Sequence, residues 1–251
     1  MQNTGITTQL NAVINGFGWV TAAGYGRGRT GGSPLWQAGE PQPPNSILKT
    51  LRGGSRFGRL DLFSQIGVAA MALALEDAGR LDTSTSPKLW TKPDLGLICA
   101  TTSSCDRTDQ DFFKTVQSDP RLASPGLFVY TLATSFLGEA ALRFTITGSS
   151  LALIEAQPSG AEALHLGLEQ LAYGDEDVMV VGISNLFNEQ NSGAPFFSGA
   201  LFLVLEKEQG GRNNLHNTIS LKPHESGFYC NDRPCSDILS LVNMICKDTP
   251  T

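Results

Sequence analysis

Apolar residues along the chain follow two patterns, and each predicts one kind of secondary structure. Continuous apolar runs of strand length occur at 12–21, 94–104, 148–156, 177–184, 199–208 and 217–223. Apolar residues three and four positions apart predict helices over 55–78, most of 124–146, 159–173 and 236–246, while 106–117 suits a helix capped by Asp106. Because strands lead directly into helices, the pattern predicts one layered α/β domain over residues 1–251.

The stretch LIEAQPSGAEAL at 153–164 is built like a nucleophile turn, in which a strand passes directly into a helix. Pro158 is expected in the first helical turn, where its missing N–H costs nothing. The apex side chain of such a turn faces free helix N–H groups, which stabilise a thiolate or an oxyanion. The apex here is Gln157, whose amide neither attacks a carbonyl nor transfers a proton. Ser159 lacks the GxSxG frame of a hydrolase nucleophile.

Glycine and proline gather between residues 22 and 54, where GYGRGRTGGSP is followed by PQPP. A phosphate-binding P-loop requires GKS or GKT, and a dinucleotide fingerprint requires a helix after its third glycine. Neither feature is present. The segment is therefore expected to be a loop insertion rather than a phosphate site.

The charge and the rarer residue types exclude several classes of function. A net charge of −6 with no basic run argues against nucleic-acid or membrane-surface partners. No apolar stretch reaches membrane-span length and no signal peptide is recognisable, so a cytoplasmic protein is expected. Neither the cysteines nor the histidines have metal-site spacing, so no metal or cofactor is expected; they are Cys99, Cys105, Cys230, Cys235, Cys246, His165, His216 and His224. His165 is expected to pair with a carboxylate on its own helix.

Five segments resemble, in order, the β-ketoacyl-[acyl carrier protein] synthases of the thiolase fold. They read INGFGWVTAAG, SRFGRLDLFSQIGVAAMALALEDAG, SPGLFV, GSSLALIEAQPSGAEALHLGLEQLAYGDEDVMVVG and GALFLVLEKE. The resemblance covers about residues 10–208, the N-terminal half of such an enzyme. It implies a single thiolase-like half, α/β/α with a mixed sheet, followed by a C-terminal extension at 209–251.

In that family the residue at the position of Gln157 is the acylated cysteine, in a motif like TACxSG. A glutamine there is similar to chain-length-factor subunits, which dimerise with an active ketosynthase and help shape its acyl tunnel. The family's catalytic histidines and lysine belong to the C-terminal half, which this sequence is not expected to reach, and neither His216 nor His224 lies in an HGTGT context. The resemblance therefore implies no catalytic residue and a degenerate nucleophile position.

The same resemblance implies the partners, which are a complete ketosynthase or a second copy of the chain, and an acyl carrier protein. Phe128, Val129, Pro158 and Ser159 are expected to line the acyl tunnel or the subunit interface, with the strand 148–156 at that interface. Two alternatives stay open. One is an independent malonyl-carrier-protein decarboxylase or acyltransferase, for which Cys105 is the candidate thiol. The other is a relic that binds carrier protein through exposed basic residues; these are Arg52, Arg56 and Arg59.

Overall fold

The structure is a computed structural model that describes residues 10–28, 31–47, 60–82, 88–89, 95–186, 198–207, 218–221, 228–230 and 233–247. The strands are β1 (Leu10–Thr21), β2 (Gly24–Arg27), β3 (Leu81–Asp82), β4 (Lys88–Leu89), β5 (Leu95–Thr101), β6 (Ser150–Ile154), β7 (Val178–Asn185), β8 (Gly199–Lys207), β9 (Thr218–Leu221), β10 (Phe228–Cys230) and β11 (Arg233–Cys235). The helices are α2 (Leu62–Asp77), α3 (Asp106–Ser118), α4 (Pro125–Phe128), α5 (Ser135–Phe144), α6 (Ala161–Tyr173) and α7 (Ile238–Lys247), with a 3-10 turn at Pro120–Leu122.

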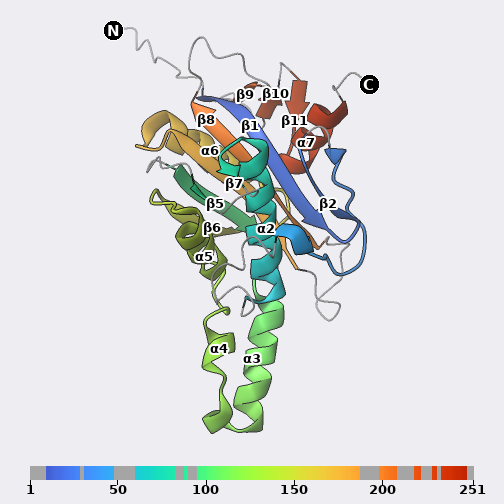
Figure 1. The fold of residues 1–251 in the computed structure, drawn as a ribbon, viewed down its shortest axis with the longest axis vertical. Coiled ribbons are helices and arrows are strands. Elements are labelled where there is room, and N and C mark those ends of the chain that lie inside the picture. Colours follow the sequence, from blue (N-terminus) through green and yellow to red (C-terminus); the bar gives the residue numbers. More distant parts are fainter. Residues whose placement is uncertain are drawn as a thin grey trace, which may run out of the picture.

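One large mixed sheet runs through the molecule in the order β11-β10-β9-β1-β8-β7-β5-β6, and β2 pairs with β1 (Figure 1). β5 is parallel to both β6 and β7, whereas β8 is antiparallel to β7 and to β1. All eight residues of β7 are buried, as a central strand with both faces covered requires. The mixed sheet expected from the sequence is confirmed.

Helices cover both faces of this sheet because side chains alternate along each strand. On one face Leu97, Val180 and Phe202 pack against α2 and α5. On the other face Val181 and Leu203 join a second core, to which α6 and α7 contribute. The result is the α/β/α layering that the sequence predicted.

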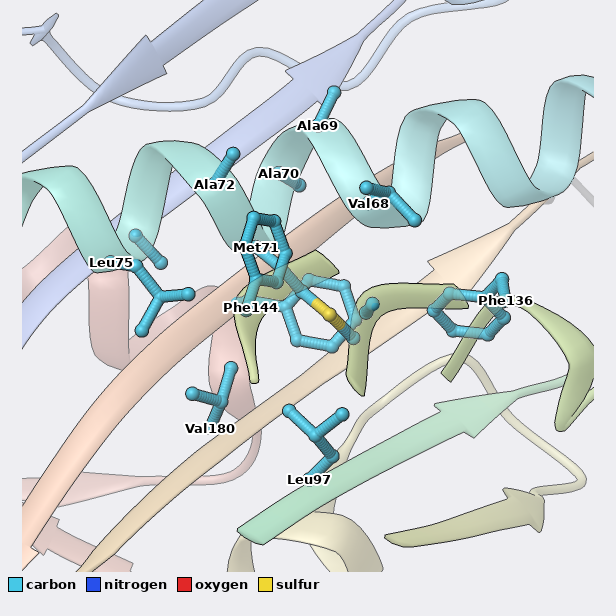
Figure 2. Close-up of a cluster of buried hydrophobic side chains, with 14 of the residues drawn as sticks. Val68, Ala69, Ala70, Met71, Ala72, Leu75, Leu97, Phe136, Phe144 and Val180 are labelled. Atoms are coloured by element: carbon cyan, nitrogen blue, oxygen red, sulfur yellow. The ribbon is translucent and has the colours of Figure 1, made fainter. Parts of the chain in front are cut away.

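Helix α2 is the central element of the first core. Asp61 caps it by accepting a hydrogen bond from Ser64 N at 3.0 Å, and Gly79 ends it with a φ of +65°. Figure 2 shows Met71 and Leu75 of α2 on the side toward the sheet, with Phe144 of α5 beside Met71 and Phe136 of α5 further along, near Val68. The predicted long helix is therefore confirmed from Leu62 onward.

The structure corrects three local predictions. The segment 124–146 forms two helices, α4 and α5, because hydrogen-bonded turns from Phe128 to Ser135 interrupt it. Asp106 is the first residue of α3, and Cys105 holds the cap position. Part of the expected glycine-rich loop is strand β2, which pairs with β1 through backbone groups and needs no apolar pattern.

Candidate functional site

The turn between β6 and α6 differs from the predicted one at its proline. Helix α6 begins at Ala161, and its cap residue Gly160 has a left-handed φ of +68°. Pro158 therefore precedes the helix instead of lying in its first turn, which corrects the prediction. Ser159 N donates to Gln157 O at 2.8 Å and closes the bend. The positive φ favours glycine at position 160. The helical conformation therefore starts only after this residue.

The carboxylate of Glu155 occupies the N-terminus of α6. Its Oε2 accepts hydrogen bonds from Gly160 N at 2.8 Å and Ser159 Oγ at 3.1 Å, and its Oε1 accepts from Glu162 N at 3.0 Å. Ala161 N donates to Ser159 Oγ at 3.1 Å. The Glu155 side chain is only 7% exposed. An internal anion thus takes the N–H groups that a nucleophile turn would offer to its apex residue.

The sequence-predicted residues of this turn lie at its outer surface. Gln157 is exposed, and Pro158 and Ser159 are half-buried. Glu155 was missed by sequence reasoning, although an acidic residue just before a helix is a recognisable capping signal. The four residues are brought together by the turn, with the carboxylate inside and the amide outside.

A second polar group lies at the C-terminal ends of the parallel strands. Asn185 is buried at the end of β7, and its Oδ1 accepts from Thr102 N at 2.7 Å and Thr101 Oγ1 at 3.2 Å. Glu155 N donates to Thr101 O at 2.9 Å, which ties the ends of β5 and β6 together. Sequence reasoning missed Asn185, whose position reads only as the end of an apolar strand. Polar contacts therefore link the C-terminal ends of β5, β6 and β7.

Cys105 has the properties of a structural cysteine. It is buried, and its Sγ donates to Thr131 O at 2.9 Å. Burial raises the pKa of its thiol; the hydrogen bond with Ser104 opposes that rise, and the nearby Asp109 carboxylate adds to it. Because the thiolate is the nucleophilic form, this environment does not activate Cys105.

Cys99 lies in the core, and His165 pairs with a carboxylate on its own helix, as predicted. Cys99 is buried in the core, and burial raises the pKa of its thiol. His165 Nε2 lies 3.1 Å from Glu169 Oε1 on the surface of α6. Among the described residues, no group of three potential metal ligands comes together, and no helix is long and apolar enough to cross a membrane.

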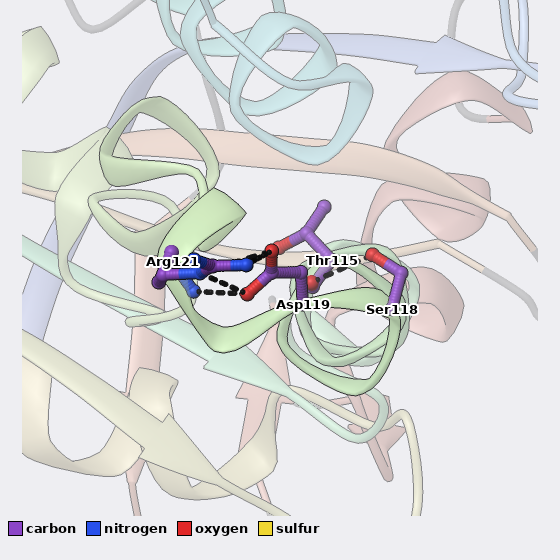
Figure 3. A network of polar contacts seen from close by, with 4 residues as sticks. All are labelled: Thr115, Ser118, Asp119 and Arg121. Atoms are coloured by element: carbon purple, nitrogen blue, oxygen red, sulfur yellow. Dashed lines mark hydrogen bonds and ion pairs between the residues drawn. The ribbon is translucent and has the colours of Figure 1, made fainter.

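Residues 106–134, here called the arm, extend away from the body of the molecule (Figure 1). At its tip the Asp119 carboxylate accepts hydrogen bonds from the side chain of Arg121, from Nε at 3.1 and 3.2 Å and from Nη2 at 2.9 Å (Figure 3), and from the Arg121 backbone N at 3.0 Å. Arg121 holds the pKa of the Asp119 carboxyl below its usual value. The ion pair stabilises the reversal from α3 toward α4, and Ser118 Oγ bonds to the carbonyl of Thr115 beside it.

Apolar side chains on the arm and along the nearby sheet edge are exposed. Phe128 lies against Phe112 with ring centroids 5.4 Å apart, yet both Phe128 and Val129 remain exposed. β6 is the outer strand of the sheet, and Ile154 on it is 69% exposed. Leu151 of β6 and Leu142 of α5 are exposed as well. These residues, Leu142, Leu151 and Ile154, are here called the apolar edge.

The predicted carrier-protein residues Arg52, Arg56 and Arg59 lie outside the described residues. So do His216 and His224. Their proposed roles remain predictions from the sequence.

The layered mixed sheet, with helices on both faces and a strand-turn-helix junction at the end of β6, is a thiolase-like ketosynthase fold. Residues 51–204 match the family described as "Beta-ketoacyl synthase, N-terminal domain". The chain therefore belongs to the β-ketoacyl synthase family.

Comparisons with individual proteins agree with this assignment. Over 125 residues the chain is 25% identical to "3-oxoacyl-[acyl-carrier-protein] synthase 2" of Vibrio cholerae serotype O1, covering 49% of this chain and 29% of that protein. It resembles "The ishigamide ketosynthase/chain length factor" with a TM-score of 0.61 and 16% identity, over 84% of this chain and 65% of the other. It also resembles a β-ketoacyl synthase from Burkholderia phymatum STM815 with a TM-score of 0.54 and 16% identity, over 83% and 62% of the two chains.

A further solved structure, "AntDE:AntF (apo): type II PKS acyl-carrier protein in complex with its ketosynthase bound to the hexaketide", gives a TM-score of 0.53 at 17% identity. That match covers 79% of this chain and 63% of the other. The chain thus spans less than two thirds of each of these three solved structures and under a third of the curated relative.

Proposed function

We propose that this chain is a catalytically deficient β-ketoacyl synthase-like subunit of the chain-length-factor kind. It pairs with a complete ketosynthase in fatty-acid, polyketide or aryl-polyene type synthesis, and an acyl carrier protein serves the pair. Its role is to shape the acyl tunnel of the partner and not to form carbon–carbon bonds itself.

The observation that carries this proposal is that the turn between β6 and α6 has Gln157 at its apex and the Glu155 carboxylate at the helix N-terminus. An acyl-enzyme requires a nucleophile whose attack is helped by a base or a lowered pKa, together with donors for the developing oxyanion. Gln157 supplies no nucleophile. The N–H groups of Gly160 and Glu162 already donate to Glu155, so they are not free for an oxyanion.

The apolar edge supports pairing with a second subunit. An exposed apolar outer strand is a site of association unless something covers it. Burying Ile154, which is 69% exposed, is worth about 1–2 kcal/mol, roughly two thirds of the value for a full isoleucine side chain. The described similarity to a "ketosynthase/chain length factor" structure favours a ketosynthase as the covering partner over an unrelated protein.

The main alternative is an independent decarboxylase or acyltransferase that uses Cys105. Burial and the raised pKa of that thiol argue against it. A direct test is carbon dioxide release from malonyl-carrier protein by the purified chain. We expect no turnover above a heat-inactivated sample; turnover that is lost in Cys105→Ala would support the alternative.

Pairing is tested by co-expression with a complete ketosynthase from the same gene neighbourhood, followed by light scattering and affinity measurement. We expect a heterodimer, and we expect Ile154→Asp to raise the Kd by at least roughly 5- to 30-fold, the equivalent of about 1–2 kcal/mol. Leu35→Asp is the matched control, because Leu35 is 68% exposed but follows β2, beyond β1 and away from β6.

The outcomes separate the possibilities. A monomer in the presence of the ketosynthase contradicts the pairing, and so does equal weakening by the two substitutions. A homodimer that excludes the ketosynthase also contradicts it, while leaving the fold unaffected.

A further inference from the structure

The side chain of Glu155 turns inward and is almost completely buried, although the residue directly follows an outer strand of the sheet. Three donors converge on its two oxygens, namely Gly160 N, Glu162 N and Ser159 Oγ, at 2.8, 3.0 and 3.1 Å. A buried carboxylate is tolerated when several donors satisfy it, and this one is satisfied by the start of α6.

The N-terminus of a helix attracts negative charge because its N–H groups are free and the helix dipole is positive there. In this chain the negative charge is supplied from within. The charge also reaches neighbouring groups: the pKa of the Cys99 thiol on β5 is raised chiefly by burial and further by the Glu155 carboxylate. A thiol at the apex of the turn, two residues from Glu155, would experience repulsion of the same sign.

The second core holds the turn from the other side. Ile238, the first residue of α7, donates its N–H to Ser159 O at 3.1 Å. A Cβ atom on Gly160 would lie 2.6 Å from the side chains of both Ile238 and Ile183. The turn is therefore held between the Glu155 carboxylate on one side and two packed isoleucines on the other.

We infer that Glu155 is an internal anion that occupies the helix N-terminus in place of a thiolate or an acyl oxyanion, so that the turn is closed to acylation even when a thiol is restored at position 157. The inference builds on the proposed loss of the nucleophile, but it concerns the isolated chain. Pairing with a ketosynthase is neither required for it nor tested by it.

A role limited to helix capping makes a different prediction. If Glu155 stabilises only the helix and its charge does not reach the apex of the turn, its removal lowers stability and leaves the acidity of a thiol at the apex unchanged. If it neutralises the N-terminus as an anion, its replacement by the isosteric amide lowers the pKa of that thiol, because the repulsion is removed and only one side-chain oxygen remains to accept the helix N–H groups.

The experiment compares Gln157→Cys with the double variant Gln157→Cys/Glu155→Gln. Alkylation by iodoacetamide is followed across pH by peptide mass spectrometry; the thiolate sulfur bonds to the reagent's CH2 carbon, iodide leaves, and the thiol proton goes to solvent. We expect the double variant to have a Cys pKa lower by about one unit, which is roughly tenfold more thiolate below both pKa values. Gln157→Cys/Glu169→Gln is the control, since Glu169 lies two turns further along α6 and bonds to His165.

Equal pKa values in the single and double variants would overturn the inference, as would an equal decrease in the Glu169 control. A second measurement needs no substitution and therefore does not depend on the folding of Glu155→Gln. In the unmodified protein the amides of Gly160 and Glu162 are expected to exchange with deuterium at least about a hundredfold more slowly than in an unstructured peptide, because both donate to a buried carboxylate. Exchange of these two amides at the unstructured rate would also overturn it.

Discussion

Gly160→Ala probes the packing of the turn without altering its charge. Gly160 has a φ of +68°, and an alanine Cβ there would lie 2.6 Å from both Ile183 Cγ2 and Ile238 Cδ1. The left-handed conformation costs a non-glycine residue about 1–2 kcal/mol. Forcing two packed isoleucines apart adds about 1–3 kcal/mol. Together these contributions predict a loss of about 2–5 kcal/mol in the free energy of unfolding.

The matched control is Gly138→Ala, in the middle of α5. No atom lies within 4 Å of a Cβ built on Gly138, so alanine fits there without displacement. Replacing a mid-helix glycine by alanine stabilises by about 0.5–1 kcal/mol. The two glycine-to-alanine changes should therefore shift stability in opposite directions.

Urea unfolding, followed by circular dichroism and tryptophan fluorescence, measures both changes. We expect the midpoint to fall for Gly160→Ala and to rise slightly for Gly138→Ala, with unchanged m-values. A loss below about 1 kcal/mol for Gly160→Ala would show that the turn relaxes freely. In that case the argument that Ile183 and Ile238 fix the turn fails.

Three further predictions follow from single residues. Phe128→Ala should lengthen the products of a ketosynthase complex, because a bulky side chain in the acyl tunnel would limit its depth. The complex itself should stay intact, because Phe128 is exposed on the arm and is not part of the apolar edge. Mass spectrometry of the products and light scattering check the two outcomes, and unchanged chain length contradicts a tunnel role. Hydrogen bonding from Ser149 lowers the pKa of Glu176, so this carboxylate stabilises the fold above its unfolded pKa and ceases to do so as pH falls through its folded pKa. Melting temperatures from about pH 5 to 3 should therefore fall more steeply in the wild type than in Glu176→Gln, and parallel curves would contradict this. Among the five cysteines only Cys246 is partly exposed, so Ellman's reagent at pH 8 should label one thiol rapidly and the others only after unfolding; rapid labelling of Cys246→Ala contradicts the assignment.

The sheet and its main helices could be predicted because their buried residues form long, regular patterns in the sequence. β7 and β8 are continuous apolar runs, and such runs occur where both faces of a strand are covered. Helix α2 is apolar on all sides, consistent with its burial between the sheet and α5. The order of the segments then sufficed to recognise the family and with it the fold.

Shorter features could not be predicted because local hydrogen bonds decide them. The break between α4 and α5 depends on turns around Thr131 that a four-residue apolar spacing does not register. Strands β10 and β11 are three residues each, too short for a pattern, and they form by pairing with each other and with β9. Pro158 was placed in the helix because sequence alone does not reveal that Gly160 takes a positive φ.

The turn between β6 and α6 combines two physical requirements, one of packing and one of charge. Glycine suits position 160 because a larger residue there would meet Ile183 and Ile238, a requirement of packing that is independent of any nucleophile. The charge at the helix start is a separate requirement, which the Glu155 carboxylate meets by accepting hydrogen bonds from Gly160 N and Glu162 N. Sequence reasoning treats the two requirements as one motif, so it registers the glutamine at position 157 but not the buried carboxylate at position 155. Gly160→Ala tests the packing requirement and Glu155→Gln tests the charge requirement. If packing and charge are separate causes, the losses in the free energy of unfolding from the two substitutions should add in the double variant.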